Sequence, residues 1–371
     1  MSSPHELPTP NPVSARKAEH LAVVASRDVE SRTPAGWDDV RLIHNALPEI
    51  DLADVDTGTD LLGRRLRIPL VIASMTGGHS AALAVNRVLA RAAEAYGLAM
   101  GVGSQRAALR DRALQYTYAV VRQEAPSAFV IANIGAPQLV EQHGAPPLSL
   151  RDVEAVVTMV GADALAVHLN YLEEAVMTEG DRRARGCLPA IRRLAGSLSV
   201  PVIGKETGAG LSRVAALSLR DAGVKALDVG GLGGTSFAAV EGARAEANGD
   251  ARGARLGELF RDWGLPTAVS LLEAKRAGLP LIATGGVRSG LDAARALALG
   301  ASAVGVARPL LLAALDGYDA VAAWIEQFVA ELRTAMFLTG AATLADLRRT
   351  LPVILGETAA WLRQLDSRPT D

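Results

Sequence analysis

The sequence contains one cysteine, few aromatic residues and almost no net charge. Cys187 alone cannot form an internal disulfide and excludes a cysteine-rich metal site. Aromatic residues make up 4% of the 371 residues and hydrophobic residues 49%, so Ala, Val, Leu and Ile must fill the core. The formal net charge of −2 gives no general attraction to nucleic acid or to a membrane surface, so any polyanion site must be local. These features predict a cytoplasmic protein with neither nucleic-acid nor membrane partners.

Two kinds of apolar segment are also missing. The longest stretch without Lys, Arg, Asp or Glu, residues 68–86, is interrupted by glycine and polar residues, so no membrane span is expected. Residues 1–14 lack the apolar centre of a signal peptide and are expected to form a disordered leader.

From residue 68 onward, short aliphatic runs alternate with alanine-rich segments of helical period. Eight such runs predict an α/β fold, a (β/α)8 TIM barrel over residues 68–371 with further C-terminal helices at 316–366. A doubly wound open sheet is the alternative. Residues 15–67, with a helix at about 16–26, are expected to form an N-terminal extension that closes over the site, and 241–259 a mobile flap. The predicted strands are 68–75, 99–103, 128–134, 164–170, 200–206, 226–230, 280–285 and 303–307.

The fourth run, residues 164–170, is followed by two acidic residues. It carries His168 and Asn170, and Glu173 and Glu174 follow three and four residues after its end. A buried parallel strand that ends in polar groups is typical of the rim where α/β active sites are built. We therefore expect the site at the carboxyl ends of the strands.

Glycine pairs follow the later strands. Backbone amides of glycine turns can approach a phosphate closely, and barrel phosphate sites usually lie after strands 7 and 8. Gly285-Gly286 with Ala307-Arg308 are therefore expected to hold a cofactor phosphate, the alternative being that these glycines only make tight turns.

A strand lysine and a basic cluster near the N-terminus complete the predicted site. Lys205 ends a buried strand, where a lysine either forms a Schiff base or donates to the electron-rich edge of a flavin. Near the N-terminus, Arg16 and His20 share one helix face, with Lys17 beside them. Most such basic clusters are only solvated, but this one is a candidate for closing over a polyanionic substrate.

The sequence resembles the type 2 isopentenyl diphosphate isomerases, FMN-dependent (β/α)8 enzymes, from Arg16 to about Leu355. The resemblance rests on motifs that occur in the same order: RKAEH at 16–20, WDDV at 37–40, IHNALP at 43–48, SMTGG at 74–78, GSQR at 103–106, NIGA at 133–136, HLN at 168–170, EGDR at 179–182, KETG at 205–208, GGT at 233–235 and DWG at 262–264.

The resemblance implies the interconversion of isopentenyl and dimethylallyl diphosphate, a 1,3-allylic proton shift with FMN reduced by NADPH, Mg²⁺ on the diphosphate, and assembly into a homotetramer or larger homo-oligomer. It places His168, Lys205 and Glu173 in catalysis and Glu174 on the metal. The implied substrate contacts are Arg16, Lys17, His20, Ser104, Gln105, Arg106, His168, Asn170 and Thr207. The implied FMN contacts are Met75, Thr76, Ser104, Asn133, Lys205, Thr235, Gly286, Arg288, Ala307 and Arg308.

One position departs from the family pattern. The resembled family has Gln-Glu where this chain has Glu173-Glu174. A neutral Glu173 would mimic the glutamine or act as an acid, whereas an ionised one would repel the diphosphate. The alternatives to the isomerase are therefore a different prenyl diphosphate or an altered reaction, a 2-hydroxy-acid oxidase type of FMN enzyme, and a non-enzymatic FMN-binding protein. The oxidase needs a histidine base, and none follows the seventh predicted strand.

Overall fold

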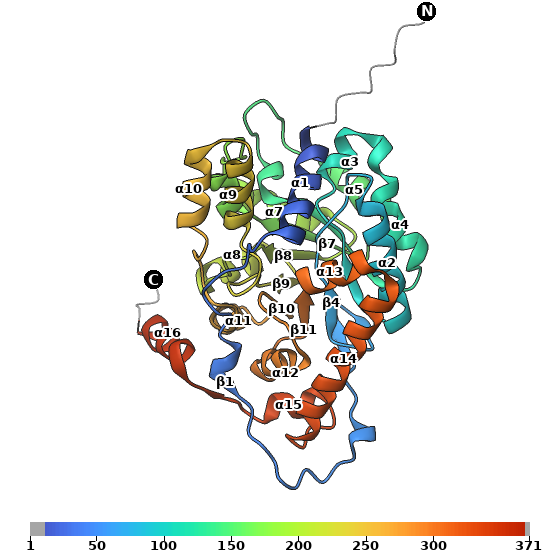
Figure 1. The fold of residues 1–371 in the computed structure, drawn as a ribbon, viewed down its shortest axis with the longest axis vertical. Coiled ribbons are helices and arrows are strands. Elements are labelled where there is room, and N and C mark those ends of the chain that lie inside the picture. Colours follow the sequence, from blue (N-terminus) through green and yellow to red (C-terminus); the bar gives the residue numbers. More distant parts are fainter. Residues whose placement is uncertain (1–11, 368–371) are drawn as a thin grey trace, which may run out of the picture.

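Eight parallel strands form a closed barrel in the computed structural model, which describes residues 12–367 (Figure 1). The strands are hydrogen-bonded in chain order, and the barrel closes where β11 pairs with β4. The (β/α)8 prediction is confirmed and the open sheet is excluded. The strands are β4 (Leu70–Ile72), β5 (Ala99–Gly101), β6 (Phe129–Gly135), β7 (Ala164–Leu169), β8 (Val202–Glu206), β9 (Ala226–Asp228), β10 (Leu281–Thr284) and β11 (Ala303–Val306).

Side chains of the strands alternate between two apolar layers. In β7, Ala164 and Ala166 face the barrel interior, whereas Leu165 and Val167 pack outward against the helices. Because both faces of each strand are buried, the strands appear in the sequence as continuous aliphatic runs. This is why all eight were predictable.

Helices surround the barrel. Several begin at a side-chain cap, such as Ser149 of α5, Ser212 of α8 and Ser289 of α12, whose oxygens accept backbone N–H groups of the first turn. None of the helices within 12–367 is both long and apolar enough to cross a membrane. After β4 the helices are α2 (Ala82–Tyr96), α3 (Arg106–Arg110), α4 (Tyr116–Glu124), α5 (Leu150–Met159), α6 (Tyr171–Val176), α7 (Cys187–Ser197), α8 (Arg213–Asp221), α9 (Phe237–Ala247), α10 (Ala251–Leu259), α11 (Thr267–Lys275), α12 (Gly290–Leu299), α13 (Arg308–Asp316), α14 (Tyr318–Phe337), α15 (Leu344–Arg349) and α16 (Gly356–Asp366).

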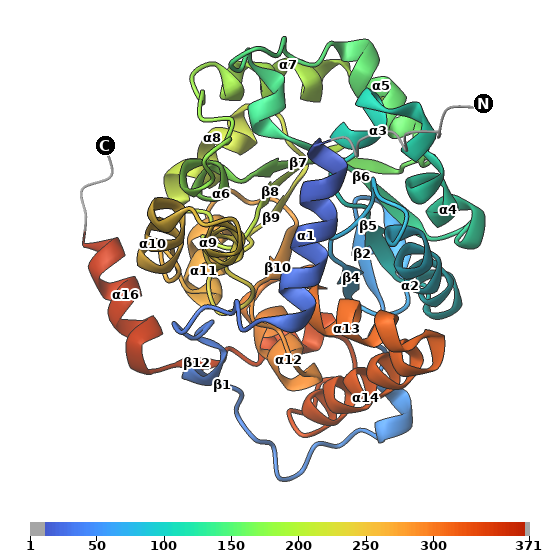
Figure 2. The same cartoon turned by 45° about the horizontal axis from the view of Figure 1, so that its top comes forward.

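The N-terminal extension reaches both ends of the barrel. Its helix α1 (Pro12–Ser26) lies across the end at which the strands terminate (Figure 2). Strand β1 (Val40–Arg41) then pairs with β12 (Val353–Ile354), and the hairpin of β2 (Thr59–Leu61) and β3 (Arg64–Leu66) packs against the opposite end. Residues 12–14, which the sequence assigned to the leader, belong to α1, and the rest of that leader lies outside the described residues.

The segment predicted as a flap, residues 241–259, is largely helical. It forms most of α9 and α10, which pack closely against each other beside α1 (Figure 1). The two helices touch at Gly242 and Gly257, where only glycine fits, because a Cβ on Gly257 would lie 2.4 Å from the Cα of Gly242. Movement of this hairpin during binding stays a prediction.

Candidate active site

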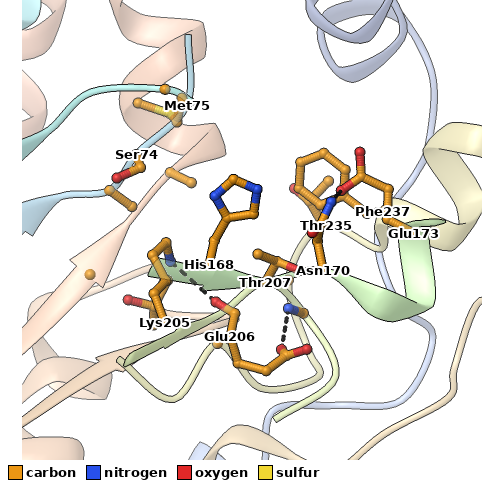
Figure 3. A pocket seen from close by; sticks show the side chains of 18 of the residues that line it. Ser74, Met75, His168, Asn170, Glu173, Lys205, Glu206, Thr207, Thr235 and Phe237 are labelled. Carbon is orange, nitrogen blue, oxygen red and sulfur yellow. Dashed lines mark hydrogen bonds between the residues drawn. The ribbon is translucent and has the colours of Figure 1, made fainter. Parts of the chain in front are cut away.

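A cavity opens at the carboxyl ends of the barrel strands, under α1 and beside α9. Figure 3 shows His168 at its centre, between Met75 on one side and Thr235 and Phe237 on the other. Most of the predicted site residues line this cavity: Arg16, Lys17, His20, Met75, Ser104, Arg106, Asn133, His168, Asn170, Glu173, Glu174, Lys205, Thr207, Thr235, Gly286, Arg288, Ala307 and Arg308.

Gln105 and Thr76 point elsewhere. The Gln105 side chain is fully buried, where Nε2 donates to the Val156 carbonyl and Oε1 accepts the Asn133 amide. Both ends of this amide are used in joining β6 to α5, so the side chain does not line the cavity, and the substrate contact of Gln105 stays a prediction. Thr76 Oγ1 lies 3.3 Å from His79 Nε2 behind the cavity wall, and its predicted FMN contact is not supported.

The glycine turns after β9 and β10 approach each other at the cavity wall. Gly286 has φ +63°, and a Cβ there would lie 2.5 Å from the Gly233 carbonyl oxygen. A Cβ on Gly234 would lie 2.9 Å from the amide nitrogen of Gly286. Only glycine therefore allows this approach, which leaves backbone exposed to a bound group. This favours the phosphate-site prediction over simple tight turns.

Two buried oxygens of the cavity lining have no hydrogen-bond partner within the described chain. They are Thr284 Oγ1, at the end of β10, and Asn170 Oδ1, after β7. Buried polar atoms are rarely left unpaired, so a bound molecule is the expected partner. Together with Arg288 and Arg308, the glycine turns and these atoms are groups that would hold a phosphate-bearing cofactor such as flavin mononucleotide.

Lys205 is held at the inner rim by a buried ion pair. Its Nζ lies 2.8 Å from Asp228 Oδ2, and both residues are less than 10% exposed. The β8–β9 register places Lys205 directly beside Asp228. An ammonium fixed in this way is a hydrogen-bond donor rather than a Schiff-base nucleophile, which favours the flavin-edge alternative.

His168 is neutral near neutral pH. Burial lowers its pKa to about 3, and the nearby Lys205 and Lys17 contribute. Asn133 Nδ2 donates to the Val102 carbonyl, so Oδ1 of Asn133 faces His168 Nδ1 at 2.7 Å. In this contact Nδ1 of His168 is therefore the donor.

Asn170 joins the two acidic residues of α6. Its Nδ2 donates to Glu173 Oε2 at 2.9 Å and to Glu174 Oε1 at 3.1 Å. Glu174 Oε2 also accepts the Asp181 amide at 2.7 Å. Burial, together with the neighbouring Glu173, raises the pKa of Glu174 to about 7, and burial raises the pKa of Glu173. A divalent cation would offset the cost of placing charge on this pair.

Glu241, which sequence reasoning missed, lies buried in α9 next to His20. Its Oε1 is 2.6 Å from His20 Nε2, and Arg244 binds its other oxygen. One ligand atom each from His20, Glu173 and Glu241 lies within 4.8 Å of the others, a spacing at which three side chains can share one divalent cation. The sequence did carry a signal for this site residue, because Glu241 is an acidic residue within the alanine-rich segment 237–245.

Other residues of the site were also missed. Phe237 lines the cavity and packs edge-on to His20, with ring centroids 6.1 Å apart. Glu206 accepts the backbone amides of Gly208 and Gly210 and thereby shapes the loop after β8. Asp228, the partner of Lys205, could have been found from the sequence, because it is a charged residue at the end of a buried strand.

The basic face of α1 lies toward the cavity. Lys17 Nζ donates to Tyr118 Oη at 2.7 Å and to the Ser104 carbonyl. Burial lowers the pKa of Lys17 to about 7, and the adjacent Arg16 contributes. Arg106 pairs with Asp181 at 2.5 Å across the same opening. Basic groups from α1 and α3 are thus brought together, as predicted for a polyanion site.

This combination of a closed barrel, a glycine-lined phosphate cradle and a rim lysine defines the class of FMN-dependent barrel enzymes. The family model described as FMN-dependent dehydrogenase matches residues 19–137 and 183–353. Two curated relatives are named isopentenyl-diphosphate delta-isomerase. The one from Methanosarcina acetivorans is 50% identical over 355 residues, which cover 95% of each chain. The one from Halobacterium salinarum is 49% identical over 354 residues, which cover 95% of this chain and 96% of the relative. The chain belongs to the type 2 isopentenyl diphosphate isomerase family.

Solved structures with the same fold are more distant. A mandelate oxidase variant with a monooxide FMN adduct is 22% identical with a TM-score of 0.59, covering 88% of this chain and 93% of that one. A lactate oxidase of Pediococcus acidilactici is 18% identical with a TM-score of 0.64, covering 91% and 87%. At this identity the likeness concerns the fold alone. The turn after β10 carries Arg288 and no histidine. The sequence had already given this missing histidine as an argument against an oxidase.

Proposed function

We propose that this chain interconverts isopentenyl diphosphate and dimethylallyl diphosphate by a 1,3-allylic proton shift. When bound, FMN reduced by NADPH supplies proton exchange at the allylic carbons, and Mg²⁺ supplies positive charge to the diphosphate. The observation that carries the proposal is that the basic face of α1 and the glycine cradle meet in one cavity, around His168 and Lys205. A diphosphate and a flavin phosphate then have separate basic sites.

The residues of the chain divide the remaining work. Arg16, Lys17 and Arg106 bind the diphosphate, and α1 excludes water from the allylic carbons. Lys205 donates to the electron-rich edge of the flavin, and neutral His168 orients the substrate. Glu174 is the carboxylate that would hold Mg²⁺ together with the diphosphate oxygens.

The direct test is product analysis. Purified protein with FMN, NADPH and Mg²⁺ under anaerobic conditions is expected to convert isopentenyl diphosphate to dimethylallyl diphosphate. Absence of conversion together with oxidation of small 2-hydroxy acids would move the chain to the oxidase alternative, and flavin binding without any turnover would favour a non-enzymatic FMN-binding protein.

Glu173 distinguishes a second candidate, in which the chain acts on another prenyl diphosphate or by altered chemistry. The observation that favours it is that Glu173 replaces the family glutamine close to Glu241. We propose that the active form of Glu173 is neutral, because burial raises its pKa.

Glu173→Gln is therefore expected to keep isomerase activity within about tenfold of the wild type. Wild-type kcat should fall as the pH rises through the raised pKa of Glu173, and the variant should lack that fall; kcat measured from pH 5 to 10 checks both. If only the variant isomerises isopentenyl diphosphate, the second candidate replaces the first.

We also propose assembly into a homotetramer or larger homo-oligomer in the cytoplasm. The support is the family membership, and light scattering coupled to size-exclusion chromatography measures the assembly state.

A further inference from the structure

One carboxylate joins the two arginines at the phosphate cradle. Glu30 Oε1 accepts from Arg288 at 2.8 Å and from Arg308 at 2.9 Å. The two arginines line the cavity beside the glycine turn after β10 and at the start of α13. Glu30 itself comes from the N-terminal extension, more than 250 positions earlier in the chain.

Glu30 is fixed from both sides along the backbone. Residues 28–33, here called the strap, run along the glycine-rich turn after β9. Ser236 donates its amide to the Val29 carbonyl and Ser31 donates its amide to the Gly234 carbonyl, both at 2.8 Å. The strap therefore belongs to the wall of the phosphate cradle.

The end of α10 holds the strap from its other side. Arg261 donates to the carbonyls of Asp28 and Glu30 at 3.0 and 2.9 Å. Asp262 Oδ1 accepts from the Ser31 hydroxyl and from the amides of Arg32 and Thr33. Asp262 of the DWG motif therefore helps to hold the strap that carries Glu30.

The two arginines depend on Glu30 to different degrees. The Arg308 guanidinium is also held by the Val24 carbonyl at 3.0 Å and by the Arg27 carbonyl at 3.4 Å. The Arg288 side chain is 36% exposed, and its guanidinium otherwise donates to its own neighbour, the Val287 carbonyl. Without Glu30, repulsion between the two cations would turn Arg288 toward solvent.

We propose that Glu30 is a positioning residue that holds Arg288 and Arg308 together as a clamp for the flavin phosphate, so that the site prefers FMN to riboflavin. The inference rests on the proposed function, in which this cradle binds FMN. Each guanidinium keeps N–H groups that Glu30 does not occupy, and these donate to the phosphate oxygens. The two cations outnumber the one carboxylate, so the cradle keeps a net positive charge for the phosphate.

The test compares FMN and riboflavin dissociation constants, measured by quenching of the fluorescence of oxidised flavin in the absence of substrate. Glu30→Ala is expected to weaken FMN binding about tenfold and riboflavin binding little, since only FMN carries the phosphate. Glu30→Gln keeps an acceptor oxygen at the same place and is expected to restore most of the FMN affinity. Glu246→Ala, which removes an exposed ion pair with Arg27 near the same strap, is the matched control and should change neither constant.

Unchanged or tighter FMN binding by Glu30→Ala would overturn the proposal, and tighter binding would identify Glu30 as a competitor of the phosphate. Equal weakening of both flavins would also overturn it, because it would mean general loosening of the strap. A wild type that binds riboflavin as well as FMN would instead contradict the flavin-phosphate site of the proposed function, and the inference would fail with it.

Discussion

Lys17 has a pKa that falls within the working pH range of most enzymes. Burial of its side chain between α1 and the cavity wall lowers it to about 7, so the free chain carries a full positive charge at this position only below that pH. Diphosphate binding requires the charged form. The KM for isopentenyl diphosphate is therefore expected to be constant well below pH 7 and to rise about tenfold per pH unit above it, roughly a hundredfold by pH 9, as the ammonium loses its proton.

Lys17→Arg gives the matched control, because a guanidinium stays charged throughout this range. The variant should show little rise in KM over the same pH series, and Lys17→Ala should show a raised KM at every pH. A parallel rise in the wild type and Lys17→Arg would assign the effect to another group.

At the residue scale, the sequence indicated which side chains gather at the site better than it indicated their contacts. The helical spacing of Arg16 and His20 predicted a shared face, and that face lines the cavity. The partner of His20 is Glu241, 221 positions away, and no local pattern records such a contact. Ser104 and Gln105 are adjacent in one motif, yet only Ser104 lines the cavity, because the direction of a side chain depends on the backbone geometry after the strand.

The α9–α10 hairpin is the element that joins the basic helix to the cavity wall. It carries Phe237 and Glu241, and its close packing depends on Gly242 and Gly257. Gly257→Ala is expected to push the helices apart, since the new Cβ meets backbone atoms at 2.4 to 2.6 Å. We expect a loss of about 1–3 kcal/mol in the free energy of unfolding and a raised KM as Glu241 moves away from His20.

Gly196→Ala in α7 tests whether the effect comes from the contact or from the substitution itself. Nothing lies within 4 Å of a Cβ at Gly196, so alanine should leave KM unchanged and stabilise the helix by up to about 1 kcal/mol. Denaturant unfolding and steady-state kinetics of both variants measure the difference. Equal behaviour of the two variants would contradict this account of the hairpin.

Elements whose partners are local were predictable, and elements that pair over long distances were not. The eight barrel strands follow from continuous aliphatic runs, and each predicted end lies within three residues of the end of the hydrogen-bonded strand. The pairing of β1 with β12 joins Val40 to Ile354, and two residues per strand leave no periodic pattern. The segment 241–259, predicted as a flap, is helical, and two of its glycines form a helix contact that the sequence did not indicate.

At the scale of the whole molecule, the two ends of the barrel have separate tasks. The cavity and its charged residues lie where the strands terminate, and the opposite end is closed by the β2–β3 hairpin. Leu61 and Leu66 of that hairpin are at most 2% exposed and extend the apolar interior that Val71 and Ile131 begin. In barrels of this kind, substitutions at the amino-terminal end affect stability and those at the carboxyl-terminal end affect catalysis.

Leu61→Ala tests this separation. The substitution leaves a cavity in a fully buried apolar cluster, so the free energy of unfolding should fall by about 2–5 kcal/mol and Tm should fall with it. The kcat and KM for isopentenyl diphosphate, measured at 25 °C where the variant is still folded, should stay within about twofold of the wild type. His168→Gln should show the opposite pattern, with kcat strongly reduced and Tm nearly unchanged, because His168 lies in the cavity rather than in an apolar cluster. A Leu61→Ala variant whose KM rises as much as its stability falls would mean that the hairpin and the site are coupled through the barrel.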